Sequence, residues 1–597
     1  MLKPSANHPV LSLQDKVGQD FSKDENEERG NWPGRMDFSI ACLVSTIGLG
    51  NVWKFPYLCS KHGAGTFIFA SGVFLIVLGM PLFLLETSCG QYTSQGVMSC
   101  WEYAPILNGI GISMIAVSAM LVMYYNTLLS NALWHVFYAI IHSGDKNWLN
   151  CDNEWNTPYC SGLIEKETAE LCEASANKSV FNTSIDYANG ICMGSRLLTF
   201  GGKTSLYHNV PVGRYVNSSN PTQKSKNIWF LPTEEFFFNR SKHVNNHNME
   251  NFGTLQWEMV LSLFAVWSII FLVLMKGIRV YGKVAYFTIF IKIVLLLLVL
   301  IRGLTLDGAK EGLDILSRFD VEELKSASLW GDAAEQIFFS LNIGLGSLIS
   351  LASYNRFHYN IIKDVMVVPI LNFITSIACT LIIYSIIGMF LEEAELQDRD
   401  NLMQSGVNLA GMYLVQLMDI YVTKWSALII SLLECLMISY LYGGKKFTED
   451  ISVMLGDMRR FPWIPWNILK YLFIVLWSVL TPALALAVFI YGIVQYSKPR
   501  YGNYVFSSWV ETLGLILGTF PVMVLAIVLF IYLIYYKVTK SSFMAAFKAS
   551  KYWGPSLTKH RVLIAHSNAF EVDPYKKGID FSDLLHMQME KSTASNA

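Results

Sequence analysis

Ten long apolar segments alternate with polar stretches along the chain. A helix that crosses a bilayer needs about 20 mainly apolar residues. The ten candidate spans are Phe38–Leu58, Phe67–Leu85, Ile110–Ile141, Met259–Met275, Val284–Ile301, Ala333–Ala352, Val365–Leu391, Ala410–Tyr442, Leu472–Val494 and Leu513–Tyr535. The third and eighth are over-long for one helix and too short for two, so each is expected to form one tilted or extended helix.

Composition supports a membrane protein and excludes other classes. Of 597 residues, 53% are hydrophobic and 15% are charged, whereas soluble proteins carry roughly a quarter charged residues. The formal net charge of −1 argues against a nucleic-acid partner. No nucleophile–base pairing, phosphate-binding loop or Cys-x-x-Cys metal spacing stands out, so an enzyme is not expected.

Basic residues in short loops predict the orientation in the membrane. With a cytosolic N-terminus, the inside loops and tail hold Lys276, Arg279, Lys283, Arg356, Lys363, Lys445, Lys446, Arg459, Arg460, Lys537, Lys540, Lys548 and Lys551. Both termini are therefore expected in the cytosol. The predicted order is a cytosolic segment (1–35), spans one to three (36–141), an extracellular loop (142–256), spans four to seven (257–391), a shortened extracellular connection (392–409), the last three spans (410–536) and a cytosolic tail (537–597).

The predicted extracellular loop has its own signals. It carries four Asn-x-Ser/Thr acceptors for glycosylation, namely Asn177, Asn182, Asn217 and Asn239. An oxidising compartment permits a disulfide between Cys151 and Cys160, the alternative being free thiols. Glycosylation and a disulfide both fit a plasma-membrane location.

Two of the ten spans are interrupted by glycine and polar residues. Span one contains TIGLGN (46–51), and span six contains SLNIGLGS (340–347). Unpaired backbone groups are costly in lipid. Paired broken helices therefore indicate an inverted-repeat transporter with a site near the membrane midplane. The alternative is close helix packing through small residues, but Asn51, Ser340 and Asn342 at the breaks favour a site.

Motifs spread over most of the chain are similar to those of the sodium- and chloride-coupled neurotransmitter and amino-acid symporters. They are RGNW (29–32), GLGNVWKFPYL (48–58), GMPLFLLETSCGQYTS (79–94), KGIRVYGKVAYFT (276–288), QIFFSLNIGLGS (336–347), SYNRFH (353–358) and PRYGNYVFSSW (499–509). The resemblance implies an all-α fold like that of the bacterial leucine transporter, with two inverted five-helix repeats and two trailing helices.

The resemblance also implies ion sites for Na⁺ and Cl⁻. The first sodium site would use the Thr46 carbonyl and the side chains of Asn51, Ser340 and Asn372. All are hard oxygen ligands suited to a small cation. The chloride site would use Gln336, Ser340 and Ser376, with Ser71 where the family has a tyrosine.

A small amino-acid substrate is implied by the residues at the break in span one. Gly48 stands where monoamine-transporting relatives have an aspartate, and Tyr125 matches the tyrosine that contacts the substrate carboxylate. The remaining substrate positions are Gly50, the aromatic lid Phe339 and Asn342. Lys54 and Asp419 match the outer gate, where lysine forms a looser pair than the usual arginine.

Ten spans are predicted where the family has twelve, because counterparts of spans eight and nine are not visible. The second sodium site, with carbonyls of Val44 and Ile47, is therefore incomplete. We expect a sodium-coupled, chloride-dependent transporter of a small neutral amino acid or amino-acid-like neurotransmitter, surrounded by membrane lipid. Two alternatives stay open: a shortened isoform, or a transport-deficient, receptor-like or assembly partner.

Overall fold

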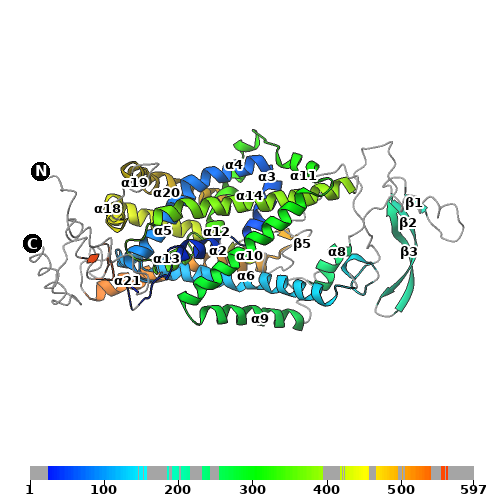
Figure 1. Cartoon of the computed structure of the whole chain (residues 1–597), viewed down its shortest axis with the longest axis horizontal. Helices are drawn as coiled ribbons and strands as arrows, with labels where there is room; N and C mark the ends of the chain where they lie inside the picture. The colour runs from blue at the N-terminus through cyan, green and yellow to red at the C-terminus, as the bar shows by residue number, and fades with distance from the viewer. Residues whose placement is uncertain are drawn as a thin grey trace, which may run out of the picture.

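The first six predicted spans all contain helices in the computed structural model (Figure 1). Span one consists of α2 (Asp37–Thr46), η1 (Gly50–Lys54) and α3 (Phe55–His62). Span two consists of α4 (Ala64–Phe74), η2 (Leu75–Gly79) and α5 (Met80–Thr93), and η3 (Pro105–Leu107) precedes α6 (Gly109–Ile141). Spans four, five and six contain α9 (Trp257–Leu274), α10 (Ile278–Leu304), and α12 (Ala327–Leu341) with α13 (Ser347–Ala352).

The last four predicted spans also contain helices. They contain α14 (Ile361–Glu393), then α17 (Lys424–Leu436), η9 (Met437–Gly443) and α18 (Gly444–Leu455), then α19 (Trp466–Val475), η11 (Leu476–Leu480) and α20 (Thr481–Val494), and finally α21 (Ser508–Val538). The short elements α11 (Ala309–Leu316) and η7 (Glu323–Lys325) lie between spans five and six.

The structure describes the chain with gaps. The described residues are 24–27, 29–144, 147–151, 153–157, 184–186, 191–200, 203–214, 232–241, 255–393, 417–419, 421–422, 424–455, 466–494, 500–501, 504–539, 547, 553–557 and 560–561. Within them, eight helices are long and apolar enough to cross a membrane, and α2 with η1–α3 forms a further span bent by 49°. The sixth predicted span is divided between α12 and α13, which are separated by the second break.

Short strands occur outside the helical bundle. Strands β1 (Ser184–Asp186), β2 (Ile191–Phe200) and β3 (Lys203–Arg214) form an antiparallel sheet in that order. It lies beyond one end of the bundle in Figure 1. The same predicted extracellular loop contains η4 (Asn147–Leu149), α8 (Pro232–Glu235) and η5 (Phe236–Ser241). Strands β4 (Arg500–Tyr501) and β5 (Tyr504–Val505) form a hairpin before α21.

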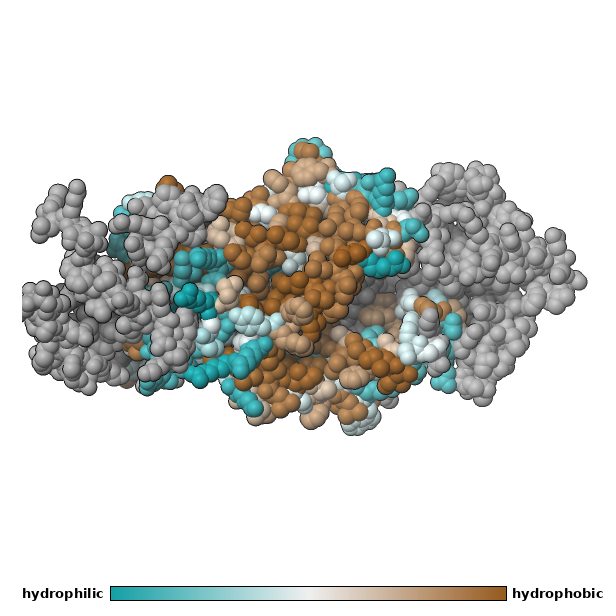
Figure 2. Space-filling view, viewed as in Figure 1, coloured by the Kyte–Doolittle hydropathy of each residue, from teal (hydrophilic) through white to brown (hydrophobic). Residues whose placement is uncertain are grey.

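The bundle has a buried centre and an apolar outside. Every residue of α5 is buried, whereas α9 and α10 leave most of their apolar side chains exposed, including Phe264, Phe287 and Leu298. Figure 2 shows a broad hydrophobic region across the middle of the bundle, with hydrophilic residues towards both ends. An exposed apolar surface of this extent is stable against lipid tails and unfavourable in water.

Segments from both ends of the chain meet at one end of the bundle. Asn26 Nδ2 donates to Ser556 Oγ at 3.1 Å, and His560 Nε2 lies 3.1 Å from Glu25 Oε1. These contacts place both segments on the same side of the helices, as the predicted cytosolic location of both termini requires.

Candidate functional site

The two predicted breaks are both present. Helix α2 ends at Thr46, and the π-helical turn η1 begins at Gly50. Helix α12 ends before Asn342, which has a left-handed φ of 57°, and Gly344 follows with a φ of 76°. Such angles are unfavourable for most side chains, so Gly344 allows the chain to turn sharply between α12 and α13.

Three of the four residues predicted for the first sodium site come together between the breaks and α14, beside Ser376 of the predicted chloride site. The fourth, Thr46, is the buried last residue of α2, and its hydroxyl donates to the Cys42 carbonyl at 2.9 Å. Asn51 Nδ2 donates to Asn372 Oδ1 at 2.6 Å and to Ser376 Oγ at 2.8 Å. Asn372 Nδ2 donates to Ser340 Oγ. All four residues are buried. This sodium cluster, defined as Asn51, Ser340, Asn372 and Ser376, concentrates neutral oxygen atoms where spans one, six and seven meet. Hard oxygen ligands of this kind suit an alkali cation.

The predicted substrate residues lie beside the break in span one. The Tyr125 hydroxyl accepts a hydrogen bond from the backbone N–H of Leu49 at 2.9 Å. A Cβ atom at Gly48 would lie 2.8 Å from the Tyr125 hydroxyl, and one at Gly50 would lie 2.8 Å from the Phe339 ring. Both glycines therefore let an aromatic side chain approach the backbone closely, as expected where a small ligand is enclosed.

Side chains also hold the two breaks in place. Asn342 Nδ2 donates to the carbonyl of Ser45 at 2.7 Å, which joins the break in span six to that in span one. The N–H of Gly344 donates to Glu86 Oε1 at 2.7 Å. Because a backbone group without a partner is costly in this environment, these contacts stabilise the unwound segments.

The carbonyls predicted for a second sodium ion contact a lysine. Lys292 of α10 donates from Nζ to the Ile47 carbonyl at 2.6 Å and to the Val44 carbonyl at 3.2 Å. Besides the predicted shortage of ligands, a positively charged side chain therefore occupies the carbonyl oxygens of this site.

The predicted chloride residues include buried groups without partners. Ser71 Oγ and Gln336 Oε1 have no hydrogen-bond partner among the described residues, and Gln336 Nε2 donates to the Gly50 carbonyl at 3.4 Å. Buried polar atoms normally have partners. The unpaired Ser71 hydroxyl is therefore available to an anion, although it replaces the larger family tyrosine.

The outer gate contains an acidic residue that the sequence analysis missed. Lys54 Nζ lies 2.9 Å from Glu335 Oε1 of α12 and 5.0 Å from the centroid of the Phe339 ring. The predicted acidic partner, Asp419, accepts a hydrogen bond from the Tyr124 hydroxyl at 3.2 Å. The structure thus connects the predicted gate lysine to the helix that carries the predicted lid.

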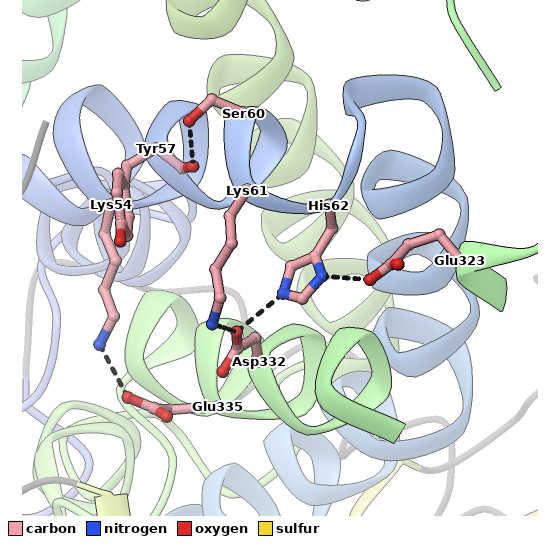
Figure 3. Close-up of polar contacts among 8 residues, drawn as sticks. All are labelled: Lys54, Tyr57, Ser60, Lys61, His62, Glu323, Asp332 and Glu335. Atoms are coloured by element: carbon pink, nitrogen blue, oxygen red, sulfur yellow. Dashed lines mark hydrogen bonds and ion pairs between the residues drawn. The ribbon is translucent and has the colours of Figure 1, made fainter. Parts of the chain in front are cut away.

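A second group of ion pairs ties α3 to α12 (Figure 3). Lys61 Nζ lies 2.6 Å and His62 Nε2 2.8 Å from Asp332 Oδ2. The other His62 nitrogen lies 2.6 Å from Glu323 Oε1 of η7. Helix α3, which follows the break in span one, is therefore bound to α12, which precedes the break in span six.

Arg29 contacts span six at the other end of the bundle. Its guanidinium donates to Ser353 Oγ at 2.7 Å and lies 4.6 Å from the Tyr354 ring, so the segment before α2 contacts the end of α13.

Burial and the Asp364 carboxylate raise the pKa of Tyr359 above its ordinary value. This hydroxyl therefore stays protonated at neutral pH.

Predictions for the extracellular loop fall partly outside the described residues, as Cys160, Asn177, Asn182 and Asn217 do. Cys151 is disulfide-bonded. Asn239 Nδ2 donates to the Trp155 carbonyl at 2.8 Å; a glycan on this nitrogen would leave it one hydrogen for that contact.

Lys292, Glu335 and Glu86 are functional candidates that sequence reasoning missed. Lys292 had a clear signal, because it is the only charged residue between Val284 and Ile301, and charges within spans are usually functional. Glu335 and Glu86 lie within or just after predicted spans, so the same rule could have identified them. Their partners depend on tertiary contacts.

Comparison with known proteins agrees with the resemblance. The chain is 29% identical to the human sodium- and chloride-dependent neutral and basic amino acid transporter B(0+), over 90% of this chain and 91% of that protein. It is 29% identical to the sodium- and chloride-dependent glycine transporter 1 of Xenopus laevis, over 90% of both chains. Glycine transporter 2 of Xenopus laevis is 28% identical, over 91% of this chain and 74% of that protein.

The alignment also contains positions that this chain lacks. The alignment to the human transporter covers 626 positions, more than the 597 residues of this chain. The relative therefore contains positions with no counterpart here. A family model described as "Sodium:neurotransmitter symporter family" matches residues 29–194, 209–410 and 400–537. The chain therefore belongs to the sodium:neurotransmitter symporter family, whose members are transporters and not enzymes.

Proposed function

We propose that this protein is a sodium-coupled secondary transporter that moves a small neutral amino acid, or an amino-acid-like neurotransmitter, across the plasma membrane by alternating access. The observation that carries the proposal is the sodium cluster at the junction of both broken helices. A cation held by Asn51, Ser340 and Asn372 would lie beside the Gly48–Gly50 segment. The amino-acid and glycine transporters that are similar to this chain are named as sodium- and chloride-dependent.

The absence of an acidic side chain at Gly48 supports a zwitterionic substrate. A buried carboxylate at that position would pair with a substrate amine, as in the monoamine-transporting relatives. With glycine there, a substrate carboxylate can approach the cation and the Tyr125 hydroxyl without repulsion. The substrate then adds negative charge next to the bound sodium, so each ligand raises the affinity for the other.

Chloride completes the proposed set of ligands. The buried hydroxyl of Ser71 has no partner among the described residues, and Ser376 links the same region to Asn51. A chloride ion near these groups would offset the charge of sodium, which favours joint binding of the two ions in a medium of low dielectric.

Alternating access requires that the two ends of the pathway open in turn. The ion pair between Lys54 and Glu335 would close the outer end, and the contact from Arg29 to Ser353 would close the inner end. In the structure both contacts are formed, as expected for a closed state between the two open ones.

A second candidate function is a transport-deficient receptor-like or assembly partner of the same family. The positions of the relative that have no counterpart here favour it, because they agree with the predicted loss of spans eight and nine. A shortened isoform of a transporter would have the same appearance.

Uptake of radiolabelled amino acids by cells that express the full chain separates these candidates. We expect accumulation of glycine or another small neutral amino acid in sodium medium, loss of it in choline medium, and a reduction when gluconate replaces chloride. Asn51→Ala at equal surface expression serves as the control. Surface expression without uptake of any amino acid would contradict transport and favour the assembly partner.

A further inference from the structure

Lys292 places a positive charge on the backbone of the broken span one. It lies in the middle of α10, where every other residue from Val284 to Ile301 is uncharged. An isolated charge at this depth is unfavourable unless it has polar partners. The lysine finds them in the carbonyls of Val44 and Ile47, at 3.2 Å and 2.6 Å from Nζ.

These carbonyls are available because the helical hydrogen bonds stop at this point. The last one joins the N–H of Ile47 to the Leu43 carbonyl at 2.9 Å. The N–H of Gly48, the helical partner expected for the Val44 carbonyl, donates instead to Asn51 Oδ1 at 3.1 Å. The N–H of Asn51, expected to bond the Ile47 carbonyl, donates to the Gly48 carbonyl at 3.2 Å. Both carbonyls therefore require another donor or a cation.

We propose that the Lys292 ammonium group is a tethered cation that substitutes for a second sodium ion at this break. A free hard cation requires several oxygen ligands, and Val44 and Ile47 supply two. An ammonium group needs only two or three acceptors, and its covalent attachment removes most of the entropy cost of binding. Lysine can thus stabilise a pair of carbonyls that would hold a free ion weakly.

The proposal deepens the proposed function, on which it rests for its consequence in transport. A tethered charge cannot leave the protein with the substrate. Only the sodium cluster then exchanges its ion, so one sodium ion is coupled to each substrate molecule. The lysine also ties α10 to α2, because its bonds to Val44 and Ile47 must lengthen or break if these helices separate.

The test uses the purified full chain in sodium-free N-methylglucamine buffer. Lys292→Ala removes three methylenes and the ammonium group, and propylammonium supplies these atoms as a free molecule. We expect the melting temperature of Lys292→Ala to fall by several degrees and to recover with millimolar propylammonium but not with 1-propanol. Wild type and the matched control Lys283→Met, an exposed lysine of the same helix, should not respond.

Equilibrium binding of radioactive sodium to the wild type provides the second measurement. We expect about one ion per chain with no cooperativity between ions, and retention of that ion in Lys292→Arg. Binding of two ions per wild-type chain would overturn the proposal. So would a folded Lys292→Ala variant whose melting temperature does not rise with propylammonium. If Lys292→Ala does not fold, the ion count alone decides. A wild type that binds no sodium at all would refute the proposed function, while the propylammonium experiment would still test the tether.

Discussion

The side chains of Lys54 and Glu335 form an ion pair of 2.9 Å across the outer side of the predicted substrate site. Glu335 and Phe339 are one helical turn apart on α12, so the pair and the lid share one helix face. Lys54 also contacts the Phe339 ring. In the proposed mechanism, closing the gate and covering the substrate would therefore be coupled through these three residues.

Neutralising this pair should weaken substrate retention. Both side chains are mostly buried, and a hydrogen bond to a charged group contributes about 1.5–3 kcal/mol. We expect Glu335→Gln and Lys54→Met each to raise the KM for uptake. The free-energy cost of the double variant should be smaller than the sum of the costs of the two single variants. The pair of Lys61 and Asp332, in which Lys61 is 44% exposed, provides a matched control with little coupling. Strictly additive effects of Lys54→Met and Glu335→Gln would show that the pair has no role in gating.

Gly48 should tolerate even one methyl group poorly. A Cβ atom there would lie 2.8 Å from the Tyr125 hydroxyl, and overpacking of this kind costs about 1–3 kcal/mol. We expect Gly48→Ala to lower the melting temperature of the purified chain, and Tyr125→Phe to recover part of the loss in the double variant, because it removes the clashing oxygen. Equal melting temperatures for Gly48→Ala with and without Tyr125→Phe would place the strain elsewhere.

Most of the fold, and the positions of several candidate site residues, were predictable for a physical reason. Spans follow from apolar length, and the breaks at Gly48 and Gly344 follow from glycines that occur together with the polar residues Asn51, Ser340 and Asn342. Asn51 and Ser340 stand at those breaks, so their place beside the unwound segments could be predicted locally. The partners of Lys292 and Glu335 could not be predicted from the sequence, because these contacts depend on which faces of α10 and α12 turn towards span one.

Chloride dependence should respond to a very small change at Ser71. The hydroxyl is buried and has no partner among the described residues, so its removal should cost the fold little. We expect Ser71→Ala to keep the melting temperature while it reduces the stimulation of uptake by chloride. Thr87→Ser, also buried but hydrogen-bonded within its own helix to the Phe83 carbonyl, is a control for packing. Unchanged chloride stimulation in Ser71→Ala would exclude Ser71 from the chloride site.

Glycosylation tests the predicted orientation of the loop at 142–256. We expect glycosidase treatment of the full chain from a glycosylating host to lower its apparent mass on a gel, and Asn239→Gln to lower it by one glycan if this site is used. A chain whose mass does not change under glycosidase would require a different orientation of the spans.

The most direct measurement of the central claim is the mutual effect of sodium and amino acid on each other's binding to the purified chain. Linkage requires that sodium raise the affinity for the amino acid by the same factor by which the amino acid raises the affinity for sodium. We predict an equal increase in both directions for the wild type, and its loss in Asn51→Ala. Amino-acid binding that is independent of sodium, or an undiminished mutual effect in Asn51→Ala, would contradict a shared site between the two broken helices.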